Sequence, residues 1–461
     1  MVKKYVYELG GLDGDGQGCA ASEARALAAL AAKNDAIHAT LDMCKNQITR
    51  HYHNHRWDNC KKYTNEYELV FTSLSDLPGL SSVSPISRSF FKLWEMLHDF
   101  CDDVFPGGAE AWSVRPVRAA FLAEGPGGFM EALARFRASA HSCRNGGVTP
   151  IDDLHGITLV PSTGSGRGVP AWRLPSSQLL RPGSFTVHQG ADGTGNLYSV
   201  ANIDHFADAV GRGSCDVVTA DGGFDFSSNF NGQEEASMRL IACEVLGALM
   251  LQRAGGALIL KVYDMKARAT IRLLHALRTC YRCVRLIKPL TSRPANSEKY
   301  VLCCGFHGAD AAAVVRVAAA LRRACTAWAH DSNVDLDHEL GASLSPLPVC
   351  LMRDVVEFNT VYIARQVCYI SRTLLLIQED VAAVPSRQTL ADRIQCQLHK
   401  SLRWCYKYNV PVSMAVIRQY QPLIATAAAK RPHHQLQAHH HHHQPPTQPQ
   451  PAAQPAAAPR G

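Results

Sequence analysis

The strongest indication of the fold lies at residues 118–129, which read RAAFLAEGPGGF. Residues 118–124 form an apolar run of strand length, a Gly-Pro-Gly-Gly turn ends it, and residues 129–140 read as a helix. Glycines at such a turn let a ligand approach the backbone, and the helix N-terminus offers free N–H groups. The turn does not match G-x-x-x-x-G-K-[ST], so a nucleoside triphosphate site is not expected, and it does not match G-x-G-x-x-G either. By itself, the turn is equally consistent with a ligand-binding role and with a purely structural role.

Further strands alternate with helices on both sides of this stretch. The strands are predicted at residues 156–160, 185–188, 215–220, 257–263, 283–288 and 300–304. The helices are predicted at 87–100, 234–253 and 265–279, with Gly255-Gly256 as the stop signal of the second. Alternation of this kind indicates an α/β fold, in which a mostly parallel sheet carries helices on both faces.

The flanking regions have a different composition. Residues 20–45 are Ala-rich with helical spacing, and helices are predicted at 309–328, 356–378 and 387–408. From residue 431 there is no acid and no lysine, and such a segment cannot bury enough apolar surface to order itself. We therefore expect an N-terminal accessory region (1–80), the α/β domain (81–308), a helical C-terminal region (309–430) and a disordered tail (431–461).

The composition excludes several classes of protein. Apolar residues make up 46% and charged residues 19% of the 461 residues, which is ordinary for a globular chain and not for a disordered or fibrous one. No apolar run reaches the length of a membrane span, and the first residues lack the core of a signal peptide, so an intracellular protein without a membrane is expected. The net charge of +7 permits a polyanionic partner without requiring one.

The 16 cysteines are expected to be mostly reduced thiols. Two groups could bind zinc in principle. One is Cys280 and Cys283 with Cys303 and Cys304, and the other is Cys44, His51, His53, His55 and Cys60. Neither has the two well-spaced ligand pairs that structural zinc sites need, so we expect no metal.

Five segments occur in a fixed order along the chain. They read SRSFFKL (87–93), GPGGF (125–129), VVTADGGF (217–224), LKVY (260–263) and KPLTSRPANSEKYV (288–301). In this order they resemble the FtsJ family of RNA ribose 2′-O-methyltransferases over about residues 85–306. The last segment is most similar to the animal mRNA cap-1 enzymes and to related proteins of large cytoplasmic DNA viruses. The resemblance implies a Rossmann-like methyltransferase sheet with S-adenosylmethionine as the methyl donor.

The family works through a Lys-Asp-Lys-Glu tetrad, and the matching residues here are Lys92, Asp221, Lys261 and Glu298. A ribose hydroxyl is a weak nucleophile, so the enzyme must orient it and provide a base. Two lysines in a partly dry cleft lower the pKa of at least one of them. We assign Lys261 as the general base, Asp221 as its partner, and Lys92 and Glu298 as orienting groups. Without the motif order, an ordinary ion pair and two solvated charges would explain the same residues.

The donor site implied by the resemblance combines the glycine turn with two later segments. Its expected members are Glu124, Gly125, Pro126, Gly127, Gly128, Phe129, Asp192, Asn196 and Asp221. Asn196 stands where the family usually has an aspartate that accepts from the adenine amino group. An amide oxygen can also accept, so this departure concerns donor affinity, and Asp192 is a candidate to compensate for it.

The resemblance implies methylation of the first nucleotide of capped mRNA, with ribosomal or transfer RNA as the alternative substrate. A catalytically inactive module that binds RNA or the cap is the alternative of a different class. Capped RNA is the expected partner, other capping or transcription proteins are open, and the expected location is the cytoplasm, with the nucleus left open. In residues 393–408, cations alternate with Trp404, Tyr406 and Tyr408. This pattern fits base stacking, but packing of the helix through Leu398, Leu402 and Cys405 is favoured over it.

Overall fold

An eight-stranded sheet forms the centre of the protein in a computed structural model, in the order β1-β7-β8-β6-β5-β2-β3-β4. The model describes residues 6–9, 20–52, 55–74, 78–107, 112, 115–142, 151–161, 170–173, 184–226, 229–382 and 387–428. The strands are β1 (Val6–Glu8), β2 (Arg118–Leu122), β3 (Asp153–Ile157), β4 (Phe185–His188), β5 (Cys215–Ala220), β6 (Gln252–Tyr263), β7 (Tyr281–Ile287) and β8 (Glu298–Phe306).

The sheet is mixed, whereas the sequence predicted a mostly parallel one. The pairs among β2, β3, β4, β5 and β6 are parallel, and those of β8 with β6 and β7 and of β1 with β7 are antiparallel. The short connection from β7 to β8 allows only an antiparallel return, because a parallel one needs a crossover of a dozen or more residues. The loop between these strands therefore lies at the same edge as the carboxyl end of β6.

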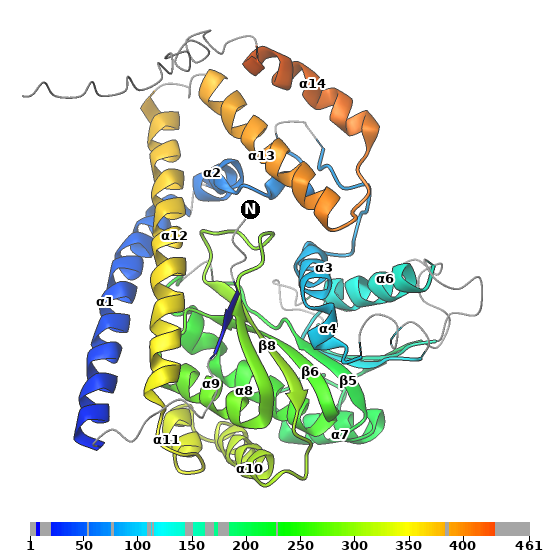
Figure 1. Ribbon diagram of the computed structural model, residues 1–461, viewed down its shortest axis with the longest axis vertical. Helices are drawn as coiled ribbons and strands as arrows, with labels where there is room; N and C mark the ends of the chain where they lie inside the picture. The colour runs from blue at the N-terminus through cyan, green and yellow to red at the C-terminus, as the bar shows by residue number, and fades with distance from the viewer. Residues whose placement is uncertain are drawn as a thin grey trace, which may run out of the picture.

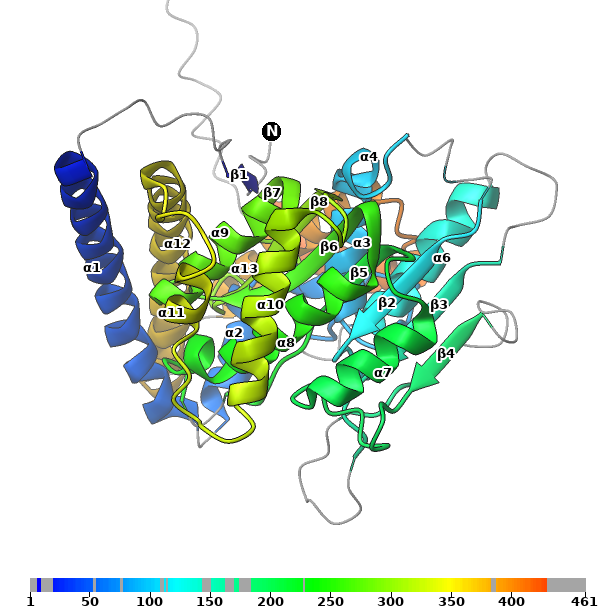
Figure 2. The same ribbon diagram turned by 90° about the horizontal axis from the view of Figure 1, so that it is seen from below.

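Helices cover both faces of the sheet, as the α/β prediction requires (Figure 2). One face carries α7 (Val200–Val210), α8 (Gln233–Leu251), α9 (Arg268–Cys280) and α10 (Ala312–Ala327). The other carries α3 (Ser89–Asp99), α4 (Cys101–Val104) and α6 (Gly128–Ser142). Two buried clusters fill these interfaces, and they place Lys92 of α3 beside the first residue of β8.

The flanking regions pack on each other although they are far apart in sequence. A long helix, α1 (Ala20–Tyr52), lies along α12 (Val349–Ala382) at one side of the sheet in both ribbon views (Figure 1). Three further helices lie beyond the carboxyl edge of the sheet: α2 (Arg56–Thr64), α13 (Arg387–Lys407) and α14 (Met414–Ala428). The described part of the chain also contains two short helices, η2 (Glu68–Val70) and α11 (Leu336–Gly341).

Several element bounds differ from the sequence prediction. The helix predicted at 234–253 is α8, which ends at Leu251. The glycine pair 255–256 lies within β6, where Gly255 has a positive φ of 80°. The strand predicted at 156–160 pairs with its neighbours over 153–157. The expected tail at 431–461 lies outside the described residues, so its disorder and the four-part division remain predictions. None of the described helices combines the length and apolarity needed to span a membrane.

Candidate active site

The structure brings the four tetrad residues together at the carboxyl edge of the parallel strands. Asp221 directly follows β5, and Lys261 lies on β6, where Leu260 is in register with Ala220. Glu298 begins β8 opposite Tyr263. The edge where parallel strands end is where open α/β sheets bind their ligands.

Two linked ion pairs form the centre of this group. The Nζ of Lys92 donates to Glu298 Oε2 at 2.6 Å, and the Nζ of Lys261 lies 3.1 Å from Asp221 Oδ1 and 2.7 Å from the Asp221 carbonyl oxygen. The hydroxyl of Tyr300 connects the pairs, since it donates to Asp221 Oδ1 at 2.8 Å and lies 3.3 Å from Lys92 Nζ. The predicted tetrad is thus one hydrogen-bonded unit in the structure.

The two lysines differ in the direction of their pKa shifts. Burial lowers the pKa of Lys92, and the nearby charges of Lys261 and Arg88 add to this against the effect of Glu298. Burial also acts on Lys261, but the charges of Asp221, Tyr263 and Glu298 outweigh it and raise its pKa. The expectation that at least one lysine has a lowered pKa holds for Lys92. The residue assigned as the base is a firmly held ammonium in this state.

Two further acids are buried below the tetrad. Burial raises the pKa of Glu124 well above its usual range, and the charge of Asp221 adds to the effect. Neither carboxylate oxygen of Glu124 has a partner that meets hydrogen-bond geometry in the described part of the chain. Burial likewise raises the pKa of Glu244, on α8, to about 8 against the lowering effect of Lys261. This floor is therefore rich in acidic groups that a cationic ligand would stabilise in their charged form.

The glycine turn after β2 leaves no room for side chains. Gly127 has a φ of 110°, and a Cβ there would approach the Trp172 ring at 3.1 Å. A Cβ on Gly125 would come within 2.0 Å of the Pro170 carbonyl oxygen. The backbone of residues 170–173 thus lies directly against the turn, and Phe129 is buried behind it beside Tyr300.

Comparison with known proteins decides what this combination is. Residues 85–306 match the FtsJ-like methyltransferase family, a range that includes all four tetrad residues and the glycine turn.

Residues 85–306 are an FtsJ-like methyltransferase domain. Three relatives carry the name cap-specific mRNA (nucleoside-2′-O-)-methyltransferase. Enzyme 1 of Mus musculus is 39% identical over 134 residues, which are 28% of this chain and 16% of that protein. Enzyme 2 of Drosophila melanogaster is 36% identical over 140 residues (28% and 20%), and enzyme 1 of Caenorhabditis elegans is 30% identical over 197 residues (41% and 21%).

The chain therefore spans between 16% and 21% of the length of these relatives. Among solved structures, one described as a ribosomal RNA methyltransferase from Plasmodium falciparum covers 48% of this chain and 98% of its own, at 17% identity and a TM-score of 0.32.

FtsJ-like methyltransferases depend on S-adenosylmethionine, and the methyltransferase domain fits this cationic donor. The orphaned carboxylate of Glu124 can accept from its ammonium group, whereas Pro170 and Trp172 occupy the space beside Gly125 and Gly127. The unpartnered acid at the end of β2 thus agrees with the predicted cationic cofactor.

Two other predicted donor residues are engaged within their own loop. Asp192 is exposed, and its Oδ1 accepts from the backbone N–H and the hydroxyl of Thr194 and from Asn202 Nδ2. These hydrogen bonds lower its pKa. The Oδ1 of Asn196 accepts from the backbone N–H of Tyr198 at 3.0 Å. Both residues shape the loop before α7, and their contact with the donor remains a prediction.

Several residues of the methyltransferase domain complete the site but had no role in the sequence prediction. Ser292 donates to Glu298 Oε1 at 2.8 Å, and Lys288 donates to the Glu298 carbonyl oxygen at 2.6 Å. Tyr300 links the two ion pairs, as described above. All three lie within the segment 288–301, which is the longest motif shared with the family. The length of this motif is the sequence feature that could have indicated their part in the site. Glu244 carried no such signal, because its helix reads only as an apolar periodic run.

The candidate zinc ligands form no cluster in the part of the chain that the structure describes. No group of three or more His, Cys, Asp or Glu there could hold a metal ion. Cys280, Cys303 and Cys304 are buried thiols. His53 lies outside the described residues.

Proposed function

We propose that this protein transfers a methyl group from S-adenosylmethionine to the ribose 2′-OH of the first nucleotide of capped mRNA. The observation that carries the proposal is the assembled tetrad, in which Lys92, Asp221, Lys261 and Glu298 lie within hydrogen-bond distance of their partners. The names of the relatives supply the substrate class. A module that only binds RNA would not need this arrangement of buried, paired charges, which is costly to form.

Each tetrad residue has a distinct part in the proposed reaction. Lys92 and Glu298 hold the acceptor ribose, because both are fixed by the 2.6 Å pair and by Ser292. When bound, the donor would supply a methyl group activated by its sulfonium. Lys261, once it has lost its own proton, would accept that of the 2′-OH, and Asp221 would stabilise the ammonium that forms. Tyr300 keeps Asp221 oriented toward Lys261.

The test is methyl transfer to short RNAs of the same sequence that differ only at their 5′ end. We expect an RNA with an N7-methylguanosine cap to be methylated on its first nucleotide, and the 5′-triphosphate RNA to react hardly at all. Mass spectrometry of nuclease digests locates the methyl group. Equal rates on both RNAs, or methylation at internal positions, would contradict capped mRNA as the substrate and favour ribosomal or transfer RNA. Donor binding without any turnover would favour an inactive module.

Three further expectations rest on the sequence alone and remain part of this proposal. They are a cytoplasmic location, association with other capping or transcription proteins, and kinship with proteins of large DNA viruses. Fractionation of the native source and recovery of tagged protein with its partners test the first two.

A further inference from the structure

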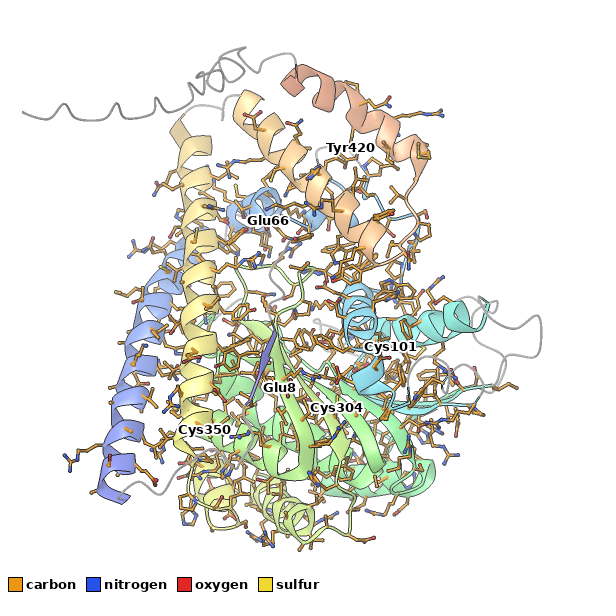
Figure 3. The ribbon with its side chains drawn as sticks, in the orientation of Figure 1. Glu8, Glu66, Cys101, Cys304, Cys350 and Tyr420 are labelled. Carbon is orange, nitrogen blue, oxygen red and sulfur yellow. The ribbon has the colours of Figure 1, made fainter. Side chains whose placement is uncertain are left out.

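A groove lies outside the tetrad, between α12 and α13. The two helices diverge, as Figure 1 shows, and Glu66, labelled in Figure 3, lies between them. The groove has a volume of about 1270 Å³, and its floor is formed by α3, by the end of β7 and by residues 66–67. Pockets for single small molecules measure about 300–1,000 Å³. The space therefore suits a ligand longer than one nucleotide.

The floor of this groove is apolar and aromatic, and its rim is cationic. Floor residues include Tyr67, Met96, Phe100, Leu290, Trp404 and Tyr408. Of the three residues predicted to pack α13 onto the α/β domain, Cys405 does so, whereas Leu398 and Leu402 pack against a cluster formed by Leu69, Leu74, Leu80 and Tyr420. The same helix also presents a free face, since Tyr406 is 88% exposed at the groove.

Two of the three acids that line the groove, Glu66 and Asp99, are paired with cations, and the third, Glu95, accepts hydrogen bonds from uncharged donors. The lining also holds Lys288, Arg365, Arg372, Lys400, Arg403 and Lys407, so positive charge is in excess. Glu66 lies 2.5 Å from Lys400 and 3.5 Å from Arg365. Asp99 lies 3.0 Å from Lys407 and accepts from the Tyr408 hydroxyl.

Two exposed arginines of the rim, Arg372 and Arg403, have no carboxylate within ion-pair distance in the described ranges. Arg372 instead lies over the ring of Tyr369 at 5.3 Å. A groove with unpaired guanidinium groups and an exposed aromatic ring complements a polyanion that carries planar groups.

The groove and the tetrad share a wall. Lys288 lines the groove, and its Nζ donates to the carbonyl oxygen of Glu298. Along α3, Lys92 faces Glu298, whereas Met96, one helical turn later, faces the groove. None of the four tetrad residues lines the groove, so α3 and the segment after β7 form the boundary between the two sites. Lys92 and Met96 lie one helical turn, about 5.4 Å, apart along this boundary.

We propose that this groove binds the single-stranded RNA that follows the methylated nucleotide. The inference rests on the proposed function for the direction of the strand. Arg372 and Arg403 contact phosphates, and Tyr406 provides a surface on which a base stacks. The groove thereby gives the enzyme an affinity for RNA length that is separate from recognition of the 5′ end.

The test compares the double variant Arg372→Glu/Arg403→Glu with a matched control, Arg316→Glu/Arg353→Glu. The control changes the net charge equally, at exposed positions on α10 and on the first turns of α12, which do not line the groove. Fluorescence anisotropy measures binding of a capped 12-nucleotide RNA over a range of salt concentrations. Methyl transfer is measured on the same RNA and on a capped dinucleotide.

We expect the groove variant to bind the 12-nucleotide RNA at least about tenfold more weakly than the control. Loss of two phosphate contacts should reduce the salt dependence, as the slope of log K against log salt, by about 1.4. In the groove variant, the kcat/KM of the longer RNA should fall to that of the dinucleotide, because its KM rises while its kcat stays unchanged. Tyr406→Ala should reduce the same advantage without changing the salt slope.

Equal RNA binding by the groove and control variants would overturn the inference. The inference would also be overturned if the groove variant lost binding to an acidic peptide but kept its RNA binding, because the groove would then be a protein-binding site. If neither RNA is methylated by the wild type but the groove variant still loses RNA affinity, the proposed function fails and the groove assignment stands. Weak RNA binding by the variant together with cap-dependent turnover supports both.

Discussion

At the scale of single residues, the site depends on which lysine carries a removable proton. Lys261 should be the base even though Asp221 raises its pKa in the donor-free state. Lys261→Ala should lower methyl transfer by a factor of about 10² to 10⁴ while donor affinity stays near that of the wild type. Lys261→Arg should be equally inactive, because a guanidinium keeps its proton near neutral pH. Single-turnover assays with calorimetry of donor binding measure both, and an active arginine variant would exclude Lys261 as the base.

The charge of Asp221 should also be visible in the pH profile. Asp221 stabilises the ammonium of Lys261, so Asp221→Asn removes the carboxylate that raises its pKa. The variant should be slower overall, but its rate should rise at lower pH than that of the wild type. Single-turnover rates at saturating donor, measured from pH 6 to pH 10, test the direction. An unchanged or higher midpoint would show that another group controls the profile.

Glu244 should make stability dependent on pH. Burial raises its folded-state pKa to about 8, above the value of an unfolded glutamate. The folded protein therefore holds this proton more tightly, and the contribution of Glu244 to stability declines as pH rises from about 4.5 to 8. Glu244→Gln should be more stable than the wild type by roughly 4 kcal/mol at pH 8 and by only about 1 kcal/mol at pH 5. Urea unfolding at both pH values measures this, and a constant difference would contradict the shift.

At the scale of elements, Glu95 joins three parts of the molecule. Its carboxylate accepts from the backbone N–H of Leu290 at 2.8 Å, from Thr291, and from Trp404 Nε1 at 3.0 Å. It thus connects α3 and α13 to the loop that precedes Glu298. Burial raises the pKa of Glu95 to about 7. The residue therefore acts as a positioning group, since it touches none of the tetrad side chains.

Removal of this link should loosen the loop. Glu95→Ala leaves buried donors unpaired, at about 1–3 kcal/mol for each unsatisfied group, and should lower kcat more than it changes the KM of the donor. Glu95→Gln keeps one acceptor oxygen and should recover most of the stability and of kcat. Thermal unfolding and steady-state kinetics of the two variants provide the comparison. Equal losses in both would mean that the carboxylate charge itself is required.

At the scale of the whole molecule, the N-terminal and C-terminal regions hold the segment after Lys261. Asp264 and Met265 have positive φ values of 47° and 71°, a strained backbone for such residues. Lys45 of α1 pairs with Asp264 at 2.7 Å. Asn34 of α1 and Asn359 of α12 both donate to the Met265 carbonyl oxygen. The helical regions therefore support the catalytic strand from outside the methyltransferase domain.

The buried pair Lys45–Asp264 provides a test of this support. Burial alone would raise the pKa of Asp264, but the charges of Lys45 and Lys299 outweigh it and hold the pKa below its usual value. Lys45→Met should destabilise the protein by about 3–5 kcal/mol, because it leaves a buried carboxylate without its main partner. The double variant Lys45→Met/Asp264→Asn should recover much of this loss. Chemical unfolding of the four proteins gives the coupling, and additive losses would contradict a linked pair.

The sequence predicted the parts of this molecule that depend on local pattern or on the matched motifs. Strands β4 and β5 were predicted at their observed bounds, and the four residues that the motifs predicted as a tetrad lie together, while their catalytic roles remain predictions. The α2 helix was not, because its polar sequence forms a helix only where Trp57 and Cys60 pack against α12. Glu95 and Glu244 were not found either, since their roles arise from contacts between segments far apart in the chain. Such contacts leave no periodicity in the sequence.

The pairing of α1 with α12 has a consequence for the order in which the chain folds. About 300 residues separate the two helices, and ribosomes add about 5–20 residues per second, so α1 is made about 15–60 s before its partner. During synthesis its apolar side, including Leu41 and Ile48, has no surface to cover it. Strand β1 likewise can pair only after β7 has been synthesised. Segments that are synthesised before the sheet thus dock last, and chaperones should stay bound longest to α1 and β1.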